Sequence, residues 1–316
     1  MIVLDMGASS DVYTVVFHPD GKHLLGGGDD GIRRWRLPDG REVGKQMEME
    51  LRAICVSEDR KWVVCGTYNG ASVWDGEMDE NVLTVEGDST VWAVDVSPDS
   101  TRFATGTSKF EVSIWTITKG ERLVGPLQHG YNVTGVQFSP DGEQIATVCL
   151  SASIHVFDSR NGVELVVIDT TTPPLAAITP LAWSGDGQRI FATSDYNSIG
   201  SFDASTGAQL AELQMPSHVY SLALAPNCKF IATFGDRSIS FLDASTLART
   251  GPVITDSEEI RSIAISADSS YLATGRRYDG KFVIRNLSQI LPDLYGPFDV
   301  GVCVLWSPHD GQAPHR

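Results

Sequence analysis

A repeat of about 40 residues is the feature that most restricts how this chain can fold. One equivalent position recurs at the end of every copy, at Trp35, Trp74, Trp115, Phe157, Phe202, Leu242 and Arg285, with spacings of 39, 41, 42, 45, 40 and 43 residues. A turn residue precedes each position by 15 to 17 residues, at Asp20, Asp59, Asp99, Asp141, Asp186, Asn227 and Asp268. Such a period indicates stacked units, none of which can bury its own faces alone.

The copy between Val133 and Asp158 is the best formed. Three runs in it alternate apolar and polar residues: 133–138, 144–148 and 154–158. Alternation of this kind, interrupted by Pro, Asp, Gly and Ser, predicts three antiparallel strands. The turn Ser139-Pro140-Asp141-Gly142 places Pro where φ is fixed and Gly where φ can be positive. A period near 40 built of short strands predicts a propeller array.

The copies resemble Trp-Asp (WD) repeats, and the resemblance covers nearly the whole chain. The only literal pair is Trp74-Asp75, whereas copies four to six end in Phe157-Asp158, Phe202-Asp203 and Leu242-Asp243. Copy seven departs furthest, with Arg285-Asn286. The resemblance implies an all-β fold, a seven-bladed β-propeller of four-stranded antiparallel blades. The whole chain would be one domain, with repeats at 12–47, 51–87, 91–130, 133–168, 178–214, 219–254 and 260–296.

The resemblance also implies an outer fourth strand for each blade. These strands would be 43–47, 82–85, 123–127, 164–168, 209–213 and 250–254, and the N-terminal segment Ile2 to Leu4 would complete blade seven. Closure by that segment would leave no unpaired strand edge.

The C-terminal end has two interpretations. Val302 to Pro308 resembles an eighth first strand, and Leu291 with Leu294 could form an outer strand of blade seven. We favour a ring closed by the N-terminal strand with 297–316 as a surplus strand and tail, over a chain cut from a longer array.

A buried polar network is a further property of the family, needed to satisfy polar groups trapped between blades. The residues that match it are His129, Asp30, Asp236, Trp35, Trp74 and Trp115, together with threonines in the second strand of a copy, which we call strand b: Thr105, Thr147, Thr193, Thr233 and Thr274. No copy has the full set. Arg285 replaces the tryptophan of copy seven, and we expect its stem to be buried and its charged head to lie in water, rather than to reach a partner.

Composition argues against several classes of protein. The net charge of −16, from 24 basic and 40 acidic residues, repels phosphate backbones and anionic lipid, so we expect no nucleic-acid and no membrane partner. No apolar run reaches the roughly 18 residues of a membrane helix, and the N-terminus has no secretory signal pattern. Five scattered cysteines predict reduced thiols in the cytoplasm or nucleus, although Cys55 and Cys65 could face each other across a hairpin.

Catalytic and metal-binding patterns are missing from the sequence. The seven histidines show no convincing metal-ligand spacing, and His18, which replaces the usual Ser of its turn, is expected at the surface. Gly26-Gly27-Gly28 lacks the Lys-Ser/Thr and the helix of a phosphate-binding loop. We therefore expect no enzyme, no cofactor and no metal.

Aromatic and arginine residues recur where the family builds the narrow top face of the ring. Residues of these kinds dominate binding hot spots. The candidates at the starts of first strands are Tyr13, Arg52, Trp92, Tyr220 and Arg261. The candidates in the turns between the second and third strands of a copy, the b–c turns, are Tyr68, Tyr196 and Tyr278. The insertion 169–177 would lengthen the same face. Each side chain could instead simply pack on the next blade.

These observations predict a scaffold that binds a protein or peptide on the top face, as a monomer or as part of a larger complex. A ligand-sensing module of a larger signalling protein and an enzyme with a pocket at the channel mouth are the alternatives.

Overall fold

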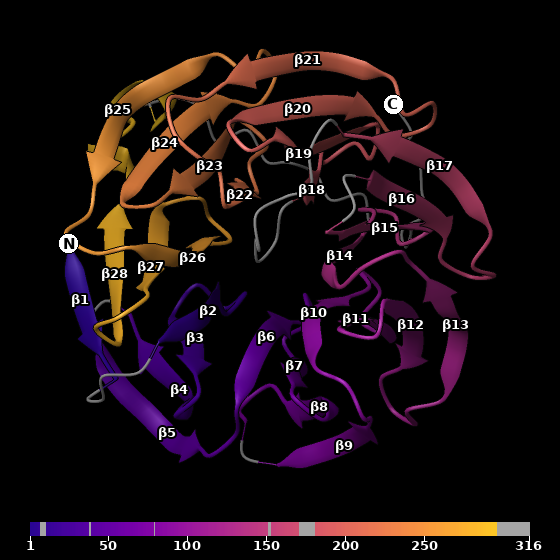
Figure 1. Cartoon of the computed structure of the whole chain (residues 1–316). Helices are drawn as coiled ribbons and strands as arrows, with labels where there is room; N and C mark the ends of the chain where they lie inside the picture. The colour runs from indigo at the N-terminus through magenta and orange to yellow at the C-terminus, as the bar shows by residue number, and fades with distance from the viewer. Residues whose placement is uncertain (7–10, 38, 79, 151–152, 171–180, 296–316) are drawn as a thin grey trace, which may run out of the picture.

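In the computed structural model, the chain forms seven four-stranded antiparallel sheets that stand like blades around a central axis (Figure 1). The structure describes residues 1–6, 11–37, 39–78, 80–150, 153–170 and 181–295. The predicted seven-bladed propeller is therefore confirmed. The predicted eighth strand at 302–308, the surplus segment 297–316 and most of the insertion 169–177 lie outside the described residues.

Blades one to four follow each other in the sequence. Blade one contains β2 (Val12–Phe17), β3 (His23–Gly28), β4 (Gly31–Arg36) and β5 (Arg41–Met47). Blade two contains β6 (Leu51–Val56), β7 (Trp62–Thr67), β8 (Gly70–Asp75) and β9 (Asn81–Glu86). Blade three contains β10 (Val91–Val96), β11 (Arg102–Thr107), β12 (Glu111–Thr116) and β13 (Arg122–Gln128). Blade four contains β14 (Val133–Phe138), β15 (Gln144–Cys149), β16 (Ser153–Asp158) and β17 (Glu164–Asp169).

Blades five and six continue this order, and blade seven combines both ends of the ring. Blade five contains β18 (Leu181–Trp183), β19 (Arg189–Asp195), β20 (Ser198–Asp203) and β21 (Gln209–Gln214). Blade six contains β22 (Ser221–Leu224), β23 (Phe230–Gly235), β24 (Ser238–Asp243) and β25 (Arg249–Thr255). Blade seven contains β26 (Ile260–Ile265), β27 (Tyr271–Arg276), β28 (Lys281–Asn286) and β1 (Ile2–Asp5). Each outer strand of blades one to six includes the range predicted from the sequence.

The N-terminal strand closes the ring, as predicted. Strand β1 pairs antiparallel with β28, and Ile2 lies opposite Ile284 while Leu4 lies opposite Phe282. The alternative outer strand around Leu291 is not formed, because the chain after β28 turns into two short 3-10 helices, η1 (Leu287–Gln289) and η2 (Pro292–Tyr295). Leu291 instead packs with buried residues of blades six and seven, including Phe241.

The apolar core is divided among the gaps between blades. Buried apolar side chains of the described residues form seven clusters, each of which joins two neighbouring blades. At the closing gap, Leu4, Phe17 and Trp35 pack against Phe282 and Ile284. Trp35 and Phe282 have ring centroids 4.9 Å apart. A side chain at Gly26 would meet the Phe282 ring at 2.6 Å, so glycine at this position makes room for the neighbouring blade.

Side chains also connect the inner strands of adjacent blades. Asp95 Oδ2 accepts a hydrogen bond from the Phe138 amide at 2.7 Å, and Ser262 Oγ accepts one from the Val15 amide at 3.1 Å. The second bond crosses the closing gap. Burial raises the pKa of Asp95 to about 7, since its carboxylate is removed from water between blades.

The cysteines Cys55 and Cys65 are free thiols, so the possible cross-hairpin disulfide is not formed. The partner of Cys65 in the β6–β7 ladder is Ile54, not Cys55. Because successive side chains of a strand point to opposite faces, the two sulfurs lie on different sides of the sheet.

The polar network between strands varies from blade to blade. In blade three, Trp115 Nε1 donates to Thr105 Oγ1 at 3.0 Å. In blade four, His129 Nε2 lies 2.7 Å from Thr147 Oγ1, and burial lowers the pKa of His129 to about 4, so its ring is neutral. Trp74 Nε1 donates to Ser72 Oγ at 3.0 Å. The remaining strand-b threonines, Thr193, Thr233 and Thr274, are all buried.

Arg285 shows where the expectation for copy seven was wrong. Its head does not lie in water: the side chain is 10% exposed and pairs with Asp256, which is fully buried. Arg285 Nη1 donates to Thr274 Oγ1 at 2.9 Å, and Arg276 Nη2 lies 2.6 Å from the second oxygen of Asp256. Asp256 stands four residues before strand β26, as His129 stands four residues before β14. A buried charged network therefore replaces the histidine–tryptophan pair in blade seven.

His18 also differs from expectation, because it is 5% exposed and not a surface residue. The turn between β2 and β3 folds its ring inward, onto Asp20.

We predict that Leu4→Ala lowers the free energy of unfolding by about 2–4 kcal/mol, since it leaves a cavity in the closing cluster. Val3→Ala is the matched control on the same strand, because Val3 is 47% exposed, and it should cost less than about 0.5 kcal/mol. Urea denaturation measures both. Equal losses for the two variants would contradict insertion of β1 into blade seven.

We predict that Asp256→Asn lowers the free energy of unfolding at pH 7 by about 3–5 kcal/mol, since it leaves the buried Arg285 without its counter-charge. Burial alone would raise the pKa of Asp256, but Arg285 and Arg276 together hold it below the usual 3.8. The carboxylate therefore stabilises the fold above the unfolded-state pKa, and this contribution is lost as the pH falls through the lower folded-state pKa.

Urea denaturation between pH 7 and pH 3 checks this prediction. The difference between wild type and Asp256→Asn should be constant near neutral pH and should narrow in the most acidic samples. Asp39→Asn is the control, because Asp39 pairs with Arg36 at an exposed position, and it should have little effect at pH 7. A difference that stays constant down to pH 3 would contradict the assignment.

Candidate functional site

The candidate site lies on the top face, which we define by the starts of the innermost strands and by the b–c turns. The innermost strands β2, β6, β10, β14, β18, β22 and β26 surround the axis of the ring (Figure 1). Residues at the beginnings of these strands therefore come close together from blades that are distant in the sequence.

Arg52 is the centre of the most tightly packed group on this face. Its side chain is 3% exposed, and its guanidinium carbon lies 4.0 Å from the ring centroid of Tyr13 and 4.0 Å from that of Tyr68. The Trp92 ring is 5.8 Å away. Arg52 Nη2 donates to Asp29 Oδ1 at 2.9 Å, and the Tyr13 hydroxyl donates to Asp29 Oδ2 at 3.0 Å. Stacking on two aromatic faces and one ion pair hold the guanidinium in place.

Several buried donors of this group have no hydrogen-bond partner among the described residues. They are Nε and Nη1 of Arg52, Nε1 of Trp92 and Nε of Arg261. The Arg261 guanidinium lies 5.6 Å from the Tyr13 ring, and burial, followed by the nearby charge of Arg277, lowers the pKa of Arg261. A buried donor without a partner is costly. The Arg52 group therefore holds several N–H donors whose hydrogen-bonding capacity is unused within the described chain.

A second group on the top face surrounds Tyr220. The Tyr220 hydroxyl donates to Asp236 Oδ1 at 2.9 Å, and burial, strengthened by this bond, raises the pKa of Tyr220. The His218 ring lies 6.5 Å from Tyr220 and 6.1 Å from Tyr196. Tyr278 belongs to neither group, and its ring lies 4.9 Å from the Arg277 guanidinium carbon.

The structure thus places five of the eight predicted top-face residues in one group: Tyr13, Arg52, Tyr68, Trp92 and Arg261. Asp30, predicted as a network residue, and its neighbour Asp29 are both exposed, and Asp29 is the one that bonds Arg52 and Tyr13. The sequence reasoning missed Asp29. Its spacing from Tyr13 is 16 residues, the same as the spacing of Asp236 from Tyr220, so this repeated Tyr–Asp interval could have identified it.

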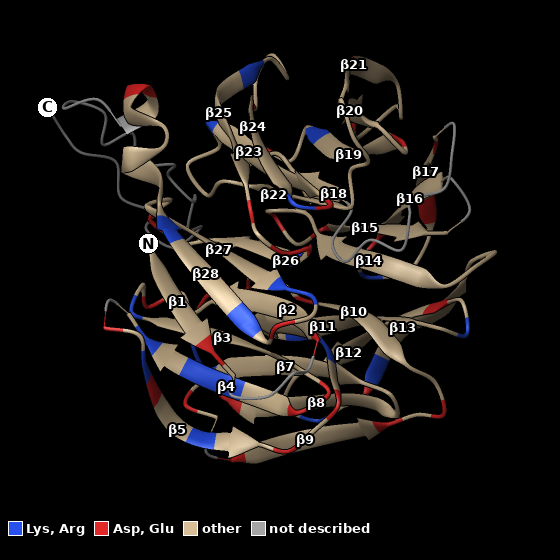
Figure 2. Ribbon diagram, turned by 60° about the vertical axis from the view of Figure 1, so that its left-hand side comes forward, with Lys and Arg blue, Asp and Glu red and all other residues tan. Residues whose placement is uncertain are grey.

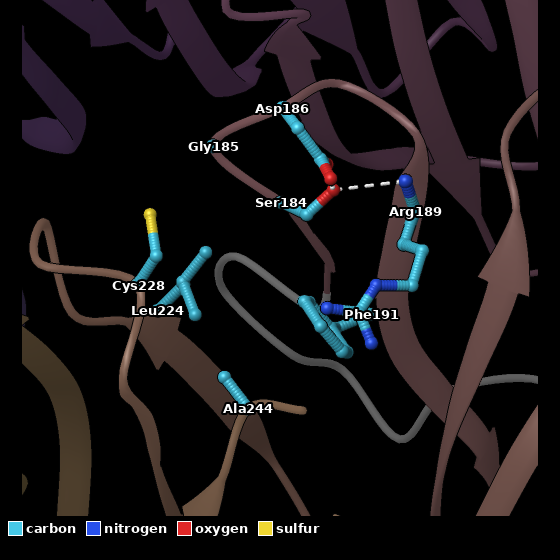
Figure 3. A pocket seen from close by; sticks show the side chains of 8 residues that line it. All are labelled: Ser184, Gly185, Asp186, Arg189, Phe191, Leu224, Cys228 and Ala244. Carbon is cyan, nitrogen blue, oxygen red and sulfur yellow. Dashed lines mark hydrogen bonds between the residues drawn. The ribbon is translucent and has the colours of Figure 1, made fainter. Parts of the chain in front are cut away.

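A cavity of about 240 Å³ lies elsewhere, between blades five and six (Figure 3). Phe191, Leu224 and Ala244 form its apolar part. Its polar groups are engaged in the β18–β19 turn, where Ser184 Oγ bonds Asp186 at 2.5 Å and accepts the Arg189 amide at 2.9 Å. These bonds stabilise the turn, and they leave the cavity without convergent polar groups.

Blade four contains an alignment of groups that resembles a hydrolase triad. Ser153 Oγ lies 2.9 Å from His155 Nε2, and His155 Nδ1 lies 2.6 Å from Glu164 Oε1. Acyl transfer also needs N–H donors that face a developing oxyanion. Ser153 belongs to a strand that is paired on both sides, opposite Cys149 and Asp169, and not to an exposed turn. The alignment therefore lacks the setting of a nucleophile.

Basic residues are interspersed with acidic ones around the ring (Figure 2). Strand β4 carries three arginines, and each pairs with a carboxylate: Arg33 with Glu42, Arg34 with Glu77 and Arg36 with Asp39. Such pairing leaves β4 without the unpaired positive charge that binds a phosphate backbone. In the described part of the chain, no helix has the length and apolar character to cross a membrane.

The chain is similar to curated proteins named eukaryotic translation initiation factor 3 subunit I. The Candida albicans protein is 26% identical over 202 residues, which are 56% of this chain and 57% of the relative. The Emericella nidulans protein is 27% identical over 219 residues, 64% of either chain. The Vanderwaltozyma polyspora protein is 22% identical over 260 residues, 73% of this chain and 75% of the relative. The chain thus spans less than two thirds of the length of the first two relatives.

A family model named WD domain, G-beta repeat, matches residues 3–36, 79–116, 122–158, 207–243 and 248–286. The first match begins within the strand that closes blade seven, and the last ends with β28. Since these matches cover more than half of the chain and the fold is a seven-bladed ring, the protein belongs to the WD-repeat family.

Proposed function

We propose that this protein is a non-catalytic interaction subunit that binds an acidic segment of a partner protein on its top face. This proposal rests on the guanidinium of Arg52, which lies between two tyrosine rings and whose Nε and Nη1 have no hydrogen-bond partner among the described residues. Arginine held in this way can bond a carboxylate with little further loss of side-chain freedom. Trp92 and Arg261 supply two more donors beside it.

Acidic character of the partner follows from the kinds of group that the site leaves free. Every buried atom of the Arg52 group that lacks a partner among the described residues is an N–H donor, and two members of the group are cationic. A negatively charged acceptor can accept hydrogen bonds from these donors and can also pair with the two cationic side chains. The two oxygens of Asp29 already accept hydrogen bonds from Arg52 Nη2 and the Tyr13 hydroxyl, so Asp29 does not serve as the acceptor for Nε and Nη1 of Arg52.

The relatives suggest the setting of such a subunit. Each is named as a subunit of a translation initiation factor. We extend that role to this chain and propose that it is a component of a multi-subunit assembly that acts in translation initiation in the cytoplasm. The two alternatives, a ligand sensor and an enzyme, have no comparable support from the contacts of the site.

We predict that Trp92→Ala and Arg261→Gln each weaken partner binding by about 30-fold, the equivalent of about 2 kcal/mol for a hot-spot residue. Tagged full-length protein is purified by affinity from cells of the organism that encodes it. Quantitative mass spectrometry then identifies the initiation-factor subunits that bind to it. Calorimetry with the purified partner then measures the affinity.

Leu165→Ala is the control, since Leu165 is 47% exposed on the outer strand β17, away from the top face. Its binding should equal that of wild type. If all three variants, with unchanged melting temperatures, bind as wild type does, the top face is not the docking surface.

A further inference from the structure

The turns between the first and second strands share one geometry in most blades. A serine hydroxyl donates to Oδ1 of an aspartate two residues later, at 2.7 Å in Ser57–Asp59 and at 2.6 Å in Ser97–Asp99, Ser139–Asp141 and Ser266–Asp268. The amide two residues beyond the aspartate donates to the same oxygen, as Lys61 does to Asp59. The turn therefore fixes the position of a carboxylate.

Blade one keeps this turn but surrounds its carboxylate with two imidazoles. Asp20 Oδ1 accepts the amides of Lys22 and His23 at 2.7 and 3.1 Å, which leaves Oδ2 for side chains. Oδ2 lies 3.1 Å from Nδ1 of His18, the residue that replaces serine, and 2.6 Å from Nδ1 of His23. All three atoms lie within 4.8 Å of one another. Residues 18 and 23 show no metal-ligand spacing in the sequence, because only the turn brings their side chains together.

The ring of His18 has a defined orientation. Its Nδ1 lies 3.2 Å from the Asp20 amide nitrogen and 3.1 Å from Asp20 Oδ2, so this ring nitrogen is directed at the carboxylate. An unprotonated imidazole nitrogen is the form that binds a metal ion. His18 is buried, whereas the side chains of Asp20 and His23 are 19% and 23% exposed, so an ion can reach the site from their side.

We propose that His18, Asp20 and His23 form a binding site for one Zn²⁺ ion. The ligands would be Nδ1 of each histidine and Oδ2 of the aspartate. Two imidazoles and one carboxylate favour zinc over magnesium or calcium, which prefer oxygen ligands. Zinc bonds of about 2.0–2.2 Å place neighbouring tetrahedral ligands about 3.3 Å apart. The observed separations of 3.1 and 2.6 Å are shorter than this value, so side-chain rotations that move the ligand atoms apart, by about 0.7 Å for His23, complete the site with water as a fourth ligand.

Titration of tag-free full-length protein with ZnCl₂ in a calorimeter tests the proposal, after removal of metals with a chelator. Wild type should bind one ion per chain. His18→Ser should fold normally, because serine is the residue of the equivalent turns, but it should weaken zinc binding by more than about 100-fold, as loss of a direct ligand exceeds the effect of losing an outer-shell partner. Asp20→Asn and His23→Gln should weaken it similarly.

Asp141→Asn is the matched control, since it changes the equivalent turn of blade four, a turn that contains no histidine, and this variant should bind zinc as wild type does. Co²⁺ provides a second readout, because absorption bands in the visible range report a four-coordinate site, and His18→Ser should lose them. Equal zinc binding by wild type, His18→Ser and Asp20→Asn would overturn the proposal, as would no binding by wild type at millimolar zinc. Circular dichroism verifies that each variant is folded.

Discussion

Pairing of β1 with β28 is the interaction on which the rest of the ring depends. A four-stranded blade has two apolar faces, and each face is covered only by the neighbouring blade. The seven apolar clusters between blades therefore need every blade to have two neighbours. Blade seven obtains its outer strand from the opposite end of the chain, so the cluster that holds Leu4, Trp35 and Phe282 forms only when the ring is closed.

The same radial arrangement explains why polar chemistry gathers at the mouth of the channel. Inner strands converge on the axis, and their first residues meet across blade boundaries. Arg52 of blade two therefore contacts Tyr13 of blade one and Trp92 of blade three. Asp29, in the turn between β3 and β4, satisfies part of this group, and its remaining buried donors have no partner within the described chain. Tyr13, Arg52, Trp92 and Arg261 are anchored in the inner strands of four blades, and such anchoring favours a preorganised binding surface.

Much of the architecture could be predicted from the sequence, because it depends on local patterns. The period of about 40 residues and the alternation within each copy predicted seven repeated units, and the resemblance to WD repeats implied the fourth strands and closure by the N-terminal segment. Contacts between residues that are not neighbours along a strand were harder to predict. Arg285 was expected in water, but its counter-ion Asp256 lies 29 residues away, in the connection between β25 and β26. Asp30 was chosen over Asp29 because spacing along a turn does not reveal which of two adjacent exposed carboxylates contacts Arg52 and Tyr13. His18 and His23 lie five positions apart in the sequence, and only the turn brings their rings onto Asp20.

The bond between Ser262 Oγ and the Val15 amide joins residues 247 positions apart. Contacts of such long range carry the largest loss of chain entropy, whereas the hairpins within each blade involve short loops. During synthesis, blades one to six can therefore assemble in order as they leave the ribosome, while the last blade must wait for both chain ends to meet. The seam between blades seven and one is consequently the late step of assembly, and it is the place where thermal opening of the ring should begin.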